Sequence, residues 1–98
     1  MTIHDAGCNS TAGGTSNTTA TFDIPATNAV AYGAYASSNG IRLSTWVLDG
    51  TTQFNAGVDE TNLLAEDTTA DRRMLFRVIG PGSATATTAV ANWSGGGN

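Results

Sequence analysis

The 98-residue chain contains no lysine, a single cysteine and a single histidine, and only 12% of its residues are charged. One cysteine excludes an internal disulfide. Soluble domains usually carry roughly 25% charged residues, so the polar surface here must consist mainly of Thr, Ser, Asn and Gly. Four arginines stand against eight carboxylates, giving a formal net charge of −4. Binding to nucleic acid or to an anionic membrane surface needs clustered cations, so neither partner is expected.

Long apolar runs are also missing. No window approaches the ~18 apolar residues that a membrane span requires. The first residues, MTIHDAGCNSTAGG, lack the basic and apolar regions of a secretory signal, so none is predicted. The length fits one domain, and a hydrophobic fraction of 40% is typical of a globular chain.

Alternation of apolar and polar residues predicts an all-β protein, a small antiparallel β-sandwich or barrel of six to seven short strands. Asp49-Gly50 is the strongest hairpin signal, and Asn39-Gly40 and Gly80-Pro81-Gly82 mark further turns. The expected strands are 19–26, 29–37, 41–48, 51–55, a segment around residues 63–64, 73–80 and 83–93.

The alternation also assigns side chains to faces within three of these strands. In 29–37 the residues Val30, Tyr32 and Ala34 share one side. In 73–80 the residues Met74, Phe76 and Val78 share one side, and Leu75, Arg77 and Ile79 share the other. In 41–48 the pattern puts Ile41, Leu43 and Val47 together, opposite Arg42, Ser44, Trp46 and Leu48.

Residues 4–19 contain no large apolar side chain and cannot bury enough surface to offset their ordering entropy. We therefore expect a flexible N-terminal arm over 1–19, a β-sandwich domain over 20–93 and a flexible tail over 94–98. Ile3 is a candidate anchor of the arm on a partner.

Catalytic and metal sites are not expected, and neither is a cofactor. His4, Asp5 and Cys8 lie close in sequence, but nothing orients them as a catalytic group requires, and His4 with Cys8 supplies two zinc ligands where a closed site needs four. Carboxylates gather between residues 59 and 71, yet they lack the spacing of a calcium loop, so a solvated acidic loop is favoured over a calcium site.

Trp46 admits two interpretations. An exposed ring on a β-sandwich can stack against sugars, which would make the protein a carbohydrate-binding or adhesive module. Tyr32 or Tyr35 would then lie near Trp46 if the strands 29–37 and 41–48 pair as a hairpin. A tryptophan of the core or of a subunit interface is the favoured alternative, because large aromatics dominate both. The last strand, 83–93, ends at Trp93, which is a further interface candidate.

The surface composition favours assembly with other subunits. Few ions must be stripped of water when a Thr/Ser/Asn/Ala surface is covered. The small-sided strand 83–93 has no lysine to protect its edge from pairing. A homo-oligomer, preferably a trimer, or a protein seated on a lattice is the expected state.

The order of features in residues 29–93 resembles small β-sandwich structural proteins of tailed bacteriophages. AVAYGAYASSNGIRLSTWVLDGTTQFNAG is followed by RMLFRVIGPGSATATTAVANW. The positions that carry the resemblance are Gly33, Tyr35, Ile41, Leu43, Asp49, Gly50, Phe76, Arg77, Val78 and Gly80. The stretch VDETNLLAEDTTAD departs from that pattern.

The resemblance implies a non-enzymatic virion protein, made in the host cytoplasm and located on the capsid surface. Capsid decoration (cement) is the expected role, with a tail or fibre module as the variant. The implied partners are the major capsid protein or other virion subunits. Arg42 and Arg77 are the candidates for specific contacts with them.

Overall fold

The computed structural model describes residues 3–11, 13–26, 28–69 and 71–94, and these form nine strands and no helix. The strands are β1 (Ser16–Thr18), β2 (Phe22–Ile24), β3 (Val30–Ser37), β4 (Leu43–Leu48), β5 (Thr51–Asn55), β6 (Leu63–Asp67), β7 (Arg72–Ile79), β8 (Ala84–Thr87) and β9 (Ala89–Trp93).

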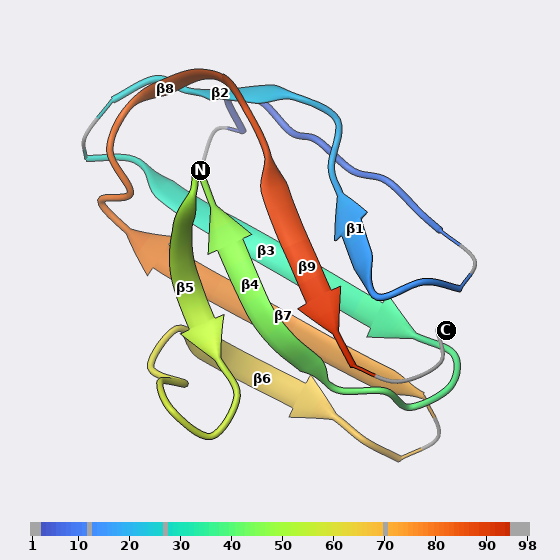
Figure 1. The fold of residues 1–98 in the computed structure, drawn as a ribbon. Helices are drawn as coiled ribbons and strands as arrows, with labels where there is room; N and C mark the ends of the chain where they lie inside the picture. Colours follow the sequence, from blue (N-terminus) through green and yellow to red (C-terminus); the bar gives the residue numbers. More distant parts are fainter. Residues whose placement is uncertain (1–2, 12, 27, 70, 95–98) are drawn as a thin grey trace.

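Two sheets face each other, and a strand pair joins them at one end (Figure 1). One sheet has the order β1-β9-β4-β5, and the other has the order β3-β7-β6. The pair β2-β8 crosses the end at which the β4–β5 hairpin turns. Every pairing is antiparallel, so the predicted all-β antiparallel sandwich is confirmed.

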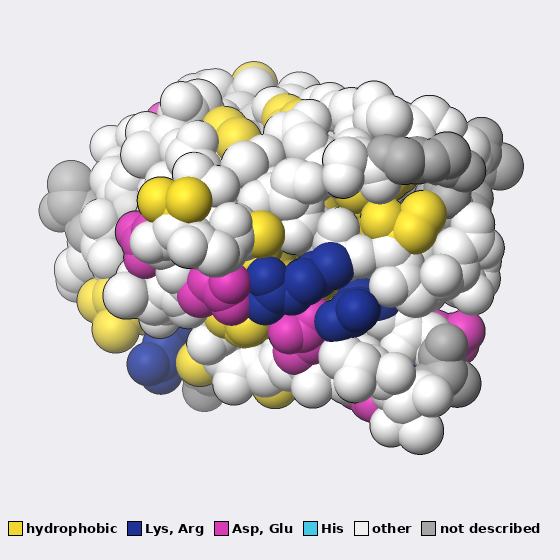
Figure 2. All heavy atoms as spheres, turned by 60° about the horizontal axis from the view of Figure 1, so that its bottom comes forward, with side chains coloured by type: hydrophobic (Ala, Val, Ile, Leu, Met, Phe, Trp, Pro, Cys, Tyr) yellow, Lys and Arg dark blue, Asp and Glu magenta, His cyan; other side chains and the backbone are white. Residues whose placement is uncertain are grey.

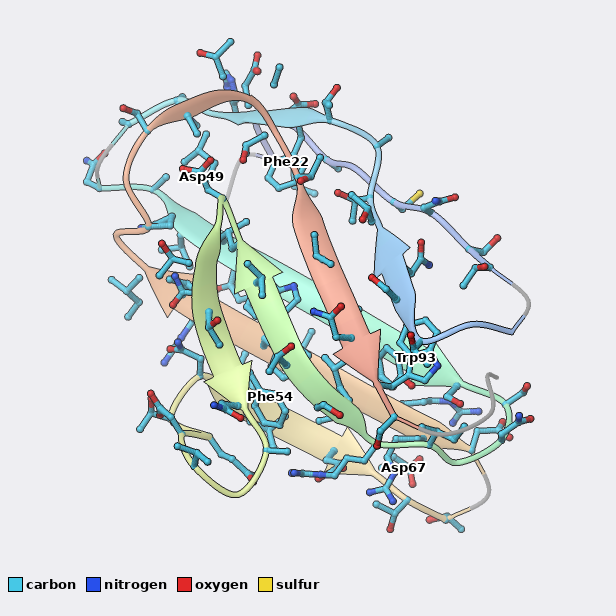
Figure 3. All side chains as sticks on the ribbon, viewed as in Figure 1. Phe22, Asp49, Phe54, Asp67 and Trp93 are labelled. Carbon is cyan, nitrogen blue, oxygen red and sulfur yellow. The ribbon has the colours of Figure 1, made fainter. Side chains whose placement is uncertain are left out.

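Aromatic side chains fill the space between the sheets. The ring of Trp46 stacks on that of Phe76, with centroids 4.9 Å apart, and Phe54 meets Phe76 at 5.1 Å. Tyr35 approaches Trp93 at the other end of the core, with centroids 6.0 Å apart. Figure 3 labels Phe54 on β5 and Trp93 on β9, near the C-terminal ends of two strands that lie on either side of β4, and both side chains are buried. These contacts join both sheets into one core.

The predicted faces hold for β7 and fail for β4. Met74, Phe76 and Val78 are buried as a set. In β4, however, Leu43, Trp46 and Leu48 all face the core, so the separation of Leu43 from Trp46 was wrong. The register with β9 shifts between Leu43 and Thr45, and this irregularity changes the phase of the alternation.

Nine strands are present among the described residues where six to seven were expected, because the segment 83–93 divides in two and β1 forms in the segment expected to be flexible. β8 pairs with β2, whereas β9 pairs with β4 and β1. Ala86 has a φ of 51°, a left-handed conformation within β8, where the register of the β2–β8 pair is irregular. The predicted hairpin at Asp49-Gly50 is confirmed, and both residues have positive φ, as a tight two-residue turn requires.

The structure differs from the flexible arm expected over 1–19. β1 belongs to the sandwich, because it pairs with β9 over three residues. The indole N–H of Trp93 donates to the Gly14 carbonyl at 2.8 Å, and its backbone N–H donates to the Thr15 carbonyl at 2.9 Å. Residues 1–2 and 95–98, the ends of the expected arm and tail, lie outside the described residues.

The segment 3–11 also lies against the sandwich. The Ala20 N–H donates to the Cys8 carbonyl at 3.3 Å, and the Asp23 N–H donates to the Asp5 carboxylate at 2.8 Å. Hydrogen bonds to backbone groups therefore hold this segment against the sandwich, although it has little apolar surface to bury.

Candidate functional site

The candidate site is the part of the solvent side of sheet β3-β7-β6 that surrounds Arg77, and we call it the outer face. The β3–β7 register is continuous over eight pairs, so alternate residues of the two strands lie side by side on it. Ala65 of β6 is opposite Leu75, and Leu64 occupies the irregularity beside it. The members of the outer face are Val30, Tyr32, Ala34, Leu64, Ala65, Leu75, Arg77 and Ile79.

Most of these side chains are apolar and open to solvent. Tyr32 is 55% exposed and Ile79 is 72% exposed, and Val30, Leu64 and Leu75 are also exposed. A hollow of about 500 Å³ runs over Ala34, Ala65 and Leu75. The side shared by Val30, Tyr32 and Ala34 is thus the solvent side of β3.

Arg77 is the single cation in the middle of this apolar surface. It lies opposite Tyr32 in the register, one position along β7 from the buried Phe76. Within the described ranges its guanidinium forms no ion pair and no side-chain hydrogen bond. An unpaired cation surrounded by apolar side chains suits a partner whose surface is apolar and carries a carboxylate opposite the arginine.

Beyond the outer face, near the start of β7, lies an arginine that is already paired. Arg73 lies 3.5 Å from Asp67 and 3.4 Å from Asp71, and all three side chains are well exposed. Exposed pairs of this kind contribute little to stability, about 0–1 kcal/mol. Arg73 therefore provides a natural comparison for Arg77.

Arg42 is engaged within the molecule. Its guanidinium donates to Glu60 at 2.7 Å and to Glu66 at 3.0 Å, and Glu66 also accepts from Arg72 at 2.7 Å. The guanidinium carbon of Arg42 lies 5.3 Å from the centre of the Phe54 ring, closing the core from the side. We call these four charged residues the ionic cluster. Figure 2 shows arginine side chains flanked by carboxylates in the middle of this side of the molecule.

The ionic cluster changes the titration of its carboxylates. Hydrogen bonds from Arg42 lower the pKa of Glu60 to about 2, with help from the Gly57 N–H. The same guanidinium lowers the pKa of Glu66, and Arg72 adds to the effect against the opposing cost of burial. Both carboxylates hold the pKa of Arg42 above its ordinary value. Both carboxylates are thus ionised at neutral pH, and their ion pairs with the arginines link the two sheets.

The other interface candidates lie in contrasting places. Trp46 is only 5% exposed and stacked on Phe76, so its ring has no free face for a sugar. Tyr35 and Tyr32, its expected neighbours, belong to the opposite sheet rather than to a hairpin with β4. Trp93 is buried beside Tyr35. Ile3 is 75% exposed and projects from the docked N-terminal segment.

His4 and Cys8 do not come together in a site. His4 borders a polar hollow with Asp23 and Pro25, and Cys8 is exposed. The described residues contain no group of three or more His, Cys, Asp or Glu that could hold a metal ion. The acidic residues all have partners of other kinds. Glu60 and Glu66 bind arginines, and Asp67 and Asp71 pair with Arg73. Backbone N–H groups donate to Asp5, Asp23, Asp59 and Asp67, and the Thr87 hydroxyl donates to Asp49.

Sequence reasoning identified Arg77 but not the apolar surface around it. The alternation gathered Val30 and Tyr32 on one side of β3 and Ile79 on the outer side of β7. It did not pair the two strands, which are separated by more than thirty residues in the chain. A signal was present, because both faces of β7 carry large apolar residues although only one can face the core.

Comparison with protein-family models, curated proteins and solved structures finds no match for this chain. The resemblance to phage structural proteins therefore stays a prediction. Within the described part of the chain, no helix has the length and apolar character needed to cross a membrane.

Proposed function

We propose that this protein is a non-enzymatic structural protein that acts by docking its outer face onto another protein subunit. The observation that carries the proposal is the exposed apolar surface centred on the unpaired Arg77. The largest contiguous apolar patch on a soluble monomer usually covers a few hundred Å², and such a patch often marks a binding site.

The size of the outer face favours a weak contact that is repeated many times. Strands lie about 4.8 Å apart and rise about 3.3 Å per residue, so the eight residues of β3, the eight of β7 and the five of β6 cover roughly 330 Å². A stable interface between two proteins usually buries about 800 Å² per partner. A contact of this size is weak for a single copy. When many linked copies bind one lattice, their contacts act together and the total affinity is high.

The setting we propose is a virion, with the protein decorating the capsid surface and bridging subunits of the major capsid protein. This setting rests on the resemblance of residues 29–93 to structural proteins of tailed bacteriophages. It is supported by the scarcity of charge, which lowers the desolvation cost of covering the surface. In this role Arg77 meets a carboxylate of the capsid subunit.

The carbohydrate-binding alternative loses its main support, because Trp46 lies in the core. Tyr32 is the one large aromatic side chain that is exposed among the described residues. A single ring without a second one beside it makes a poor stacking platform, so we do not favour this function.

Mass spectrometry of purified virus particles tests the setting. We expect the protein at hundreds of copies, in a fixed ratio to the major capsid protein. A few copies per particle would assign it to the tail or a fibre instead. Its absence from particles, together with its presence on cells or in the medium, would overturn the virion setting.

Re-binding of the purified protein to particles stripped of it tests the docking surface. We expect Arg77→Glu to weaken retention about tenfold or more, because a repelling charge then faces the capsid carboxylate. Arg73→Glu is the matched control, since Arg73 is exposed on the same sheet but paired to Asp67 and Asp71. Equal retention of the Arg77→Glu variant and the parent would contradict docking through the outer face.

A further inference from the structure

The open edges of the two sheets differ in how they are protected. Edge strands present unpaired N–H and C=O groups, and proteins block them with short strands, charges, irregularities or covering segments. β1 is three residues long, and the Asn9 side chain of the N-terminal segment donates to the Thr18 carbonyl at its edge. The Asn62 side chain donates to the Gln53 carbonyl of β5 in the same way.

β6 is protected by different means. It contains Glu66 and Asp67, and its register with β7 shifts between Leu63 and Ala65. An incoming strand would meet two carboxylates and a distorted edge. Three of the four edge strands of the two main sheets are therefore unsuited to further pairing.

β3 has none of these protections. It is eight residues long, contains no charged residue and no proline, and pairs with β7 without irregularity. No charged residue occurs between Asp23 and Arg42. The Gly80 N–H donates to the Ala29 carbonyl at 2.9 Å, so by the alternation of an antiparallel ladder the odd-numbered residues bond to β7. Even-numbered residues direct their N–H and C=O groups to the open edge, which no described segment pairs.

We propose that two copies of this chain pair antiparallel through their β3 edges, forming a continuous six-stranded sheet across a two-fold axis. An unprotected edge strand pairs well with an identical one, and a two-fold arrangement uses the same edge of both copies and closes the assembly. The remaining edges of the new sheet are the two β6 strands, which carry their own protection.

Charge permits this contact although each chain carries a net charge of −4. The strands that meet are uncharged, so no like charges lie opposite each other. The nearest outward charge near the centre of the sheet is Arg77, on the strand next to β3. The two Arg77 positions are then three strand spacings apart, about 14 Å. This exceeds the screening length of about 8 Å at physiological ionic strength, so their repulsion is weak.

Pairing also keeps the two outer faces on one side of the joined sheet, because opposite residues of an antiparallel pair point the same way. The apolar strip formed by Val30, Tyr32 and Ala34 becomes continuous with its copy. The inference does not depend on the virion setting, and it predicts a dimer rather than the trimer favoured by the sequence.

Sedimentation equilibrium of the full chain tests the pairing. We expect the parent protein to have twice the mass of one chain. Ala34→Pro removes an edge N–H without removing a bond to β7, and we expect it to raise the dimer dissociation constant about tenfold or more. Ala34→Lys keeps the backbone N–H but brings two positive charges together where the β3 strands meet, and we expect it to be monomeric as well. It separates loss of pairing from any effect that the proline has on folding.

Ile79→Lys is the matched control, because Ile79 lies on the same outer face but one strand away from the open edge. We expect it to remain dimeric. A parent protein that is monomeric or trimeric would overturn the pairing, and so would dimers that persist in both Ala34 variants. Dissociation by Ile79→Lys alone would assign self-association to the outer face. A monomeric parent that still binds particles would overturn only the pairing and leave the proposed function in place.

Discussion

At the scale of single residues, Gly33 determines how closely the two sheets approach. A Cβ atom at this position would lie 2.3 Å from the Trp46 ring, much closer than two carbon atoms can come. The ring therefore lies directly on the β3 backbone, where it also stacks on Phe76. The glycine is needed because it leaves room for the ring, and its φ lies outside the left-handed region.

We expect Gly33→Ala to destabilise the protein by about 1–3 kcal/mol, because the added methyl group forces Trp46 from its position in a packed core. Urea unfolding gives the free energy, and near-ultraviolet circular dichroism reports the displaced ring. Ala34→Ser, one residue along and on the solvent side, is the control and should change stability by less than about 0.5 kcal/mol. Equal stability of the Gly33→Ala variant and the parent would contradict the close approach.

At the scale of elements, local sequence patterns predict where the strands lie. They predict less well which side chains face the core and which segments pack against the sheets. Alternation located β3 and β7 within a residue or two, and Asp49-Gly50 located the β4–β5 hairpin. The irregularity in β4 was not predictable in this way, because it shifts the phase of the strand without a distinctive residue type. Leu43 was therefore placed on the face opposite Trp46, although both side chains face the core. The N-terminal segment was also misjudged, since its order comes from hydrogen bonds to backbone groups rather than from apolar burial.

The docking of the N-terminal segment can be tested at Gly7. A Cβ atom there would lie 2.3 Å from the Ala20 carbonyl oxygen, and backbone cannot yield as a flexible side chain can. We expect Gly7→Ala to release the segment, so that the amide hydrogens of Ala20 and Asp23 exchange about tenfold faster or more. Hydrogen exchange followed by NMR measures this, and amides of β7 should keep their parent rates.

Ala6→Ser, at the exposed neighbouring position, is the control for Gly7→Ala and should leave the exchange of Ala20 and Asp23 unchanged. Unchanged exchange in the Gly7→Ala variant would show that the segment is not held against β2 through this contact.

At the scale of the whole molecule, the ionic cluster joins parts of the chain that belong to different layers. Arg42 directly precedes β4 of one sheet, and Glu66 and Arg72 belong to β6 and β7 of the other. Arg42 was instead predicted to contact another subunit. Its neighbours in the sequence give no sign of the two glutamates that reach it from 18 and 24 residues away. Long-range pairing of this kind follows from the sheet topology, which short sequence patterns do not specify.

The cluster makes the stability of the molecule depend on acid. The pKa of Glu60 is lowered from 4.5 to about 2 in the folded protein, and that of Glu66 is also lowered. Between about pH 5 and pH 2 the unfolded chain therefore binds more protons than the folded one, so the free energy of unfolding falls as the pH falls through this range. Above about pH 5 both glutamates are ionised in the folded and in the unfolded chain. Their contribution to the free energy of unfolding is then constant, so they no longer change the melting temperature with pH.

We expect a clearly lower melting temperature at pH 3 than at pH 6, and a smaller difference between the two for Glu60→Gln, which loses the ion pair at both values. Differential scanning calorimetry at these two values also avoids the region near pH 4.4, where the chain has no net charge and tends to associate. Asp71→Asn, in the exposed pair with Arg73, is the control and should keep the parent's difference. If Glu60→Gln and the parent lose the same number of degrees on acidification, the acid response arises outside the ionic cluster. A smaller fall in melting temperature for Glu60→Gln would show that acid destabilises the protein through the ionic cluster. Because the cluster links the two sheets, acid then weakens the contact between the layers of the sandwich.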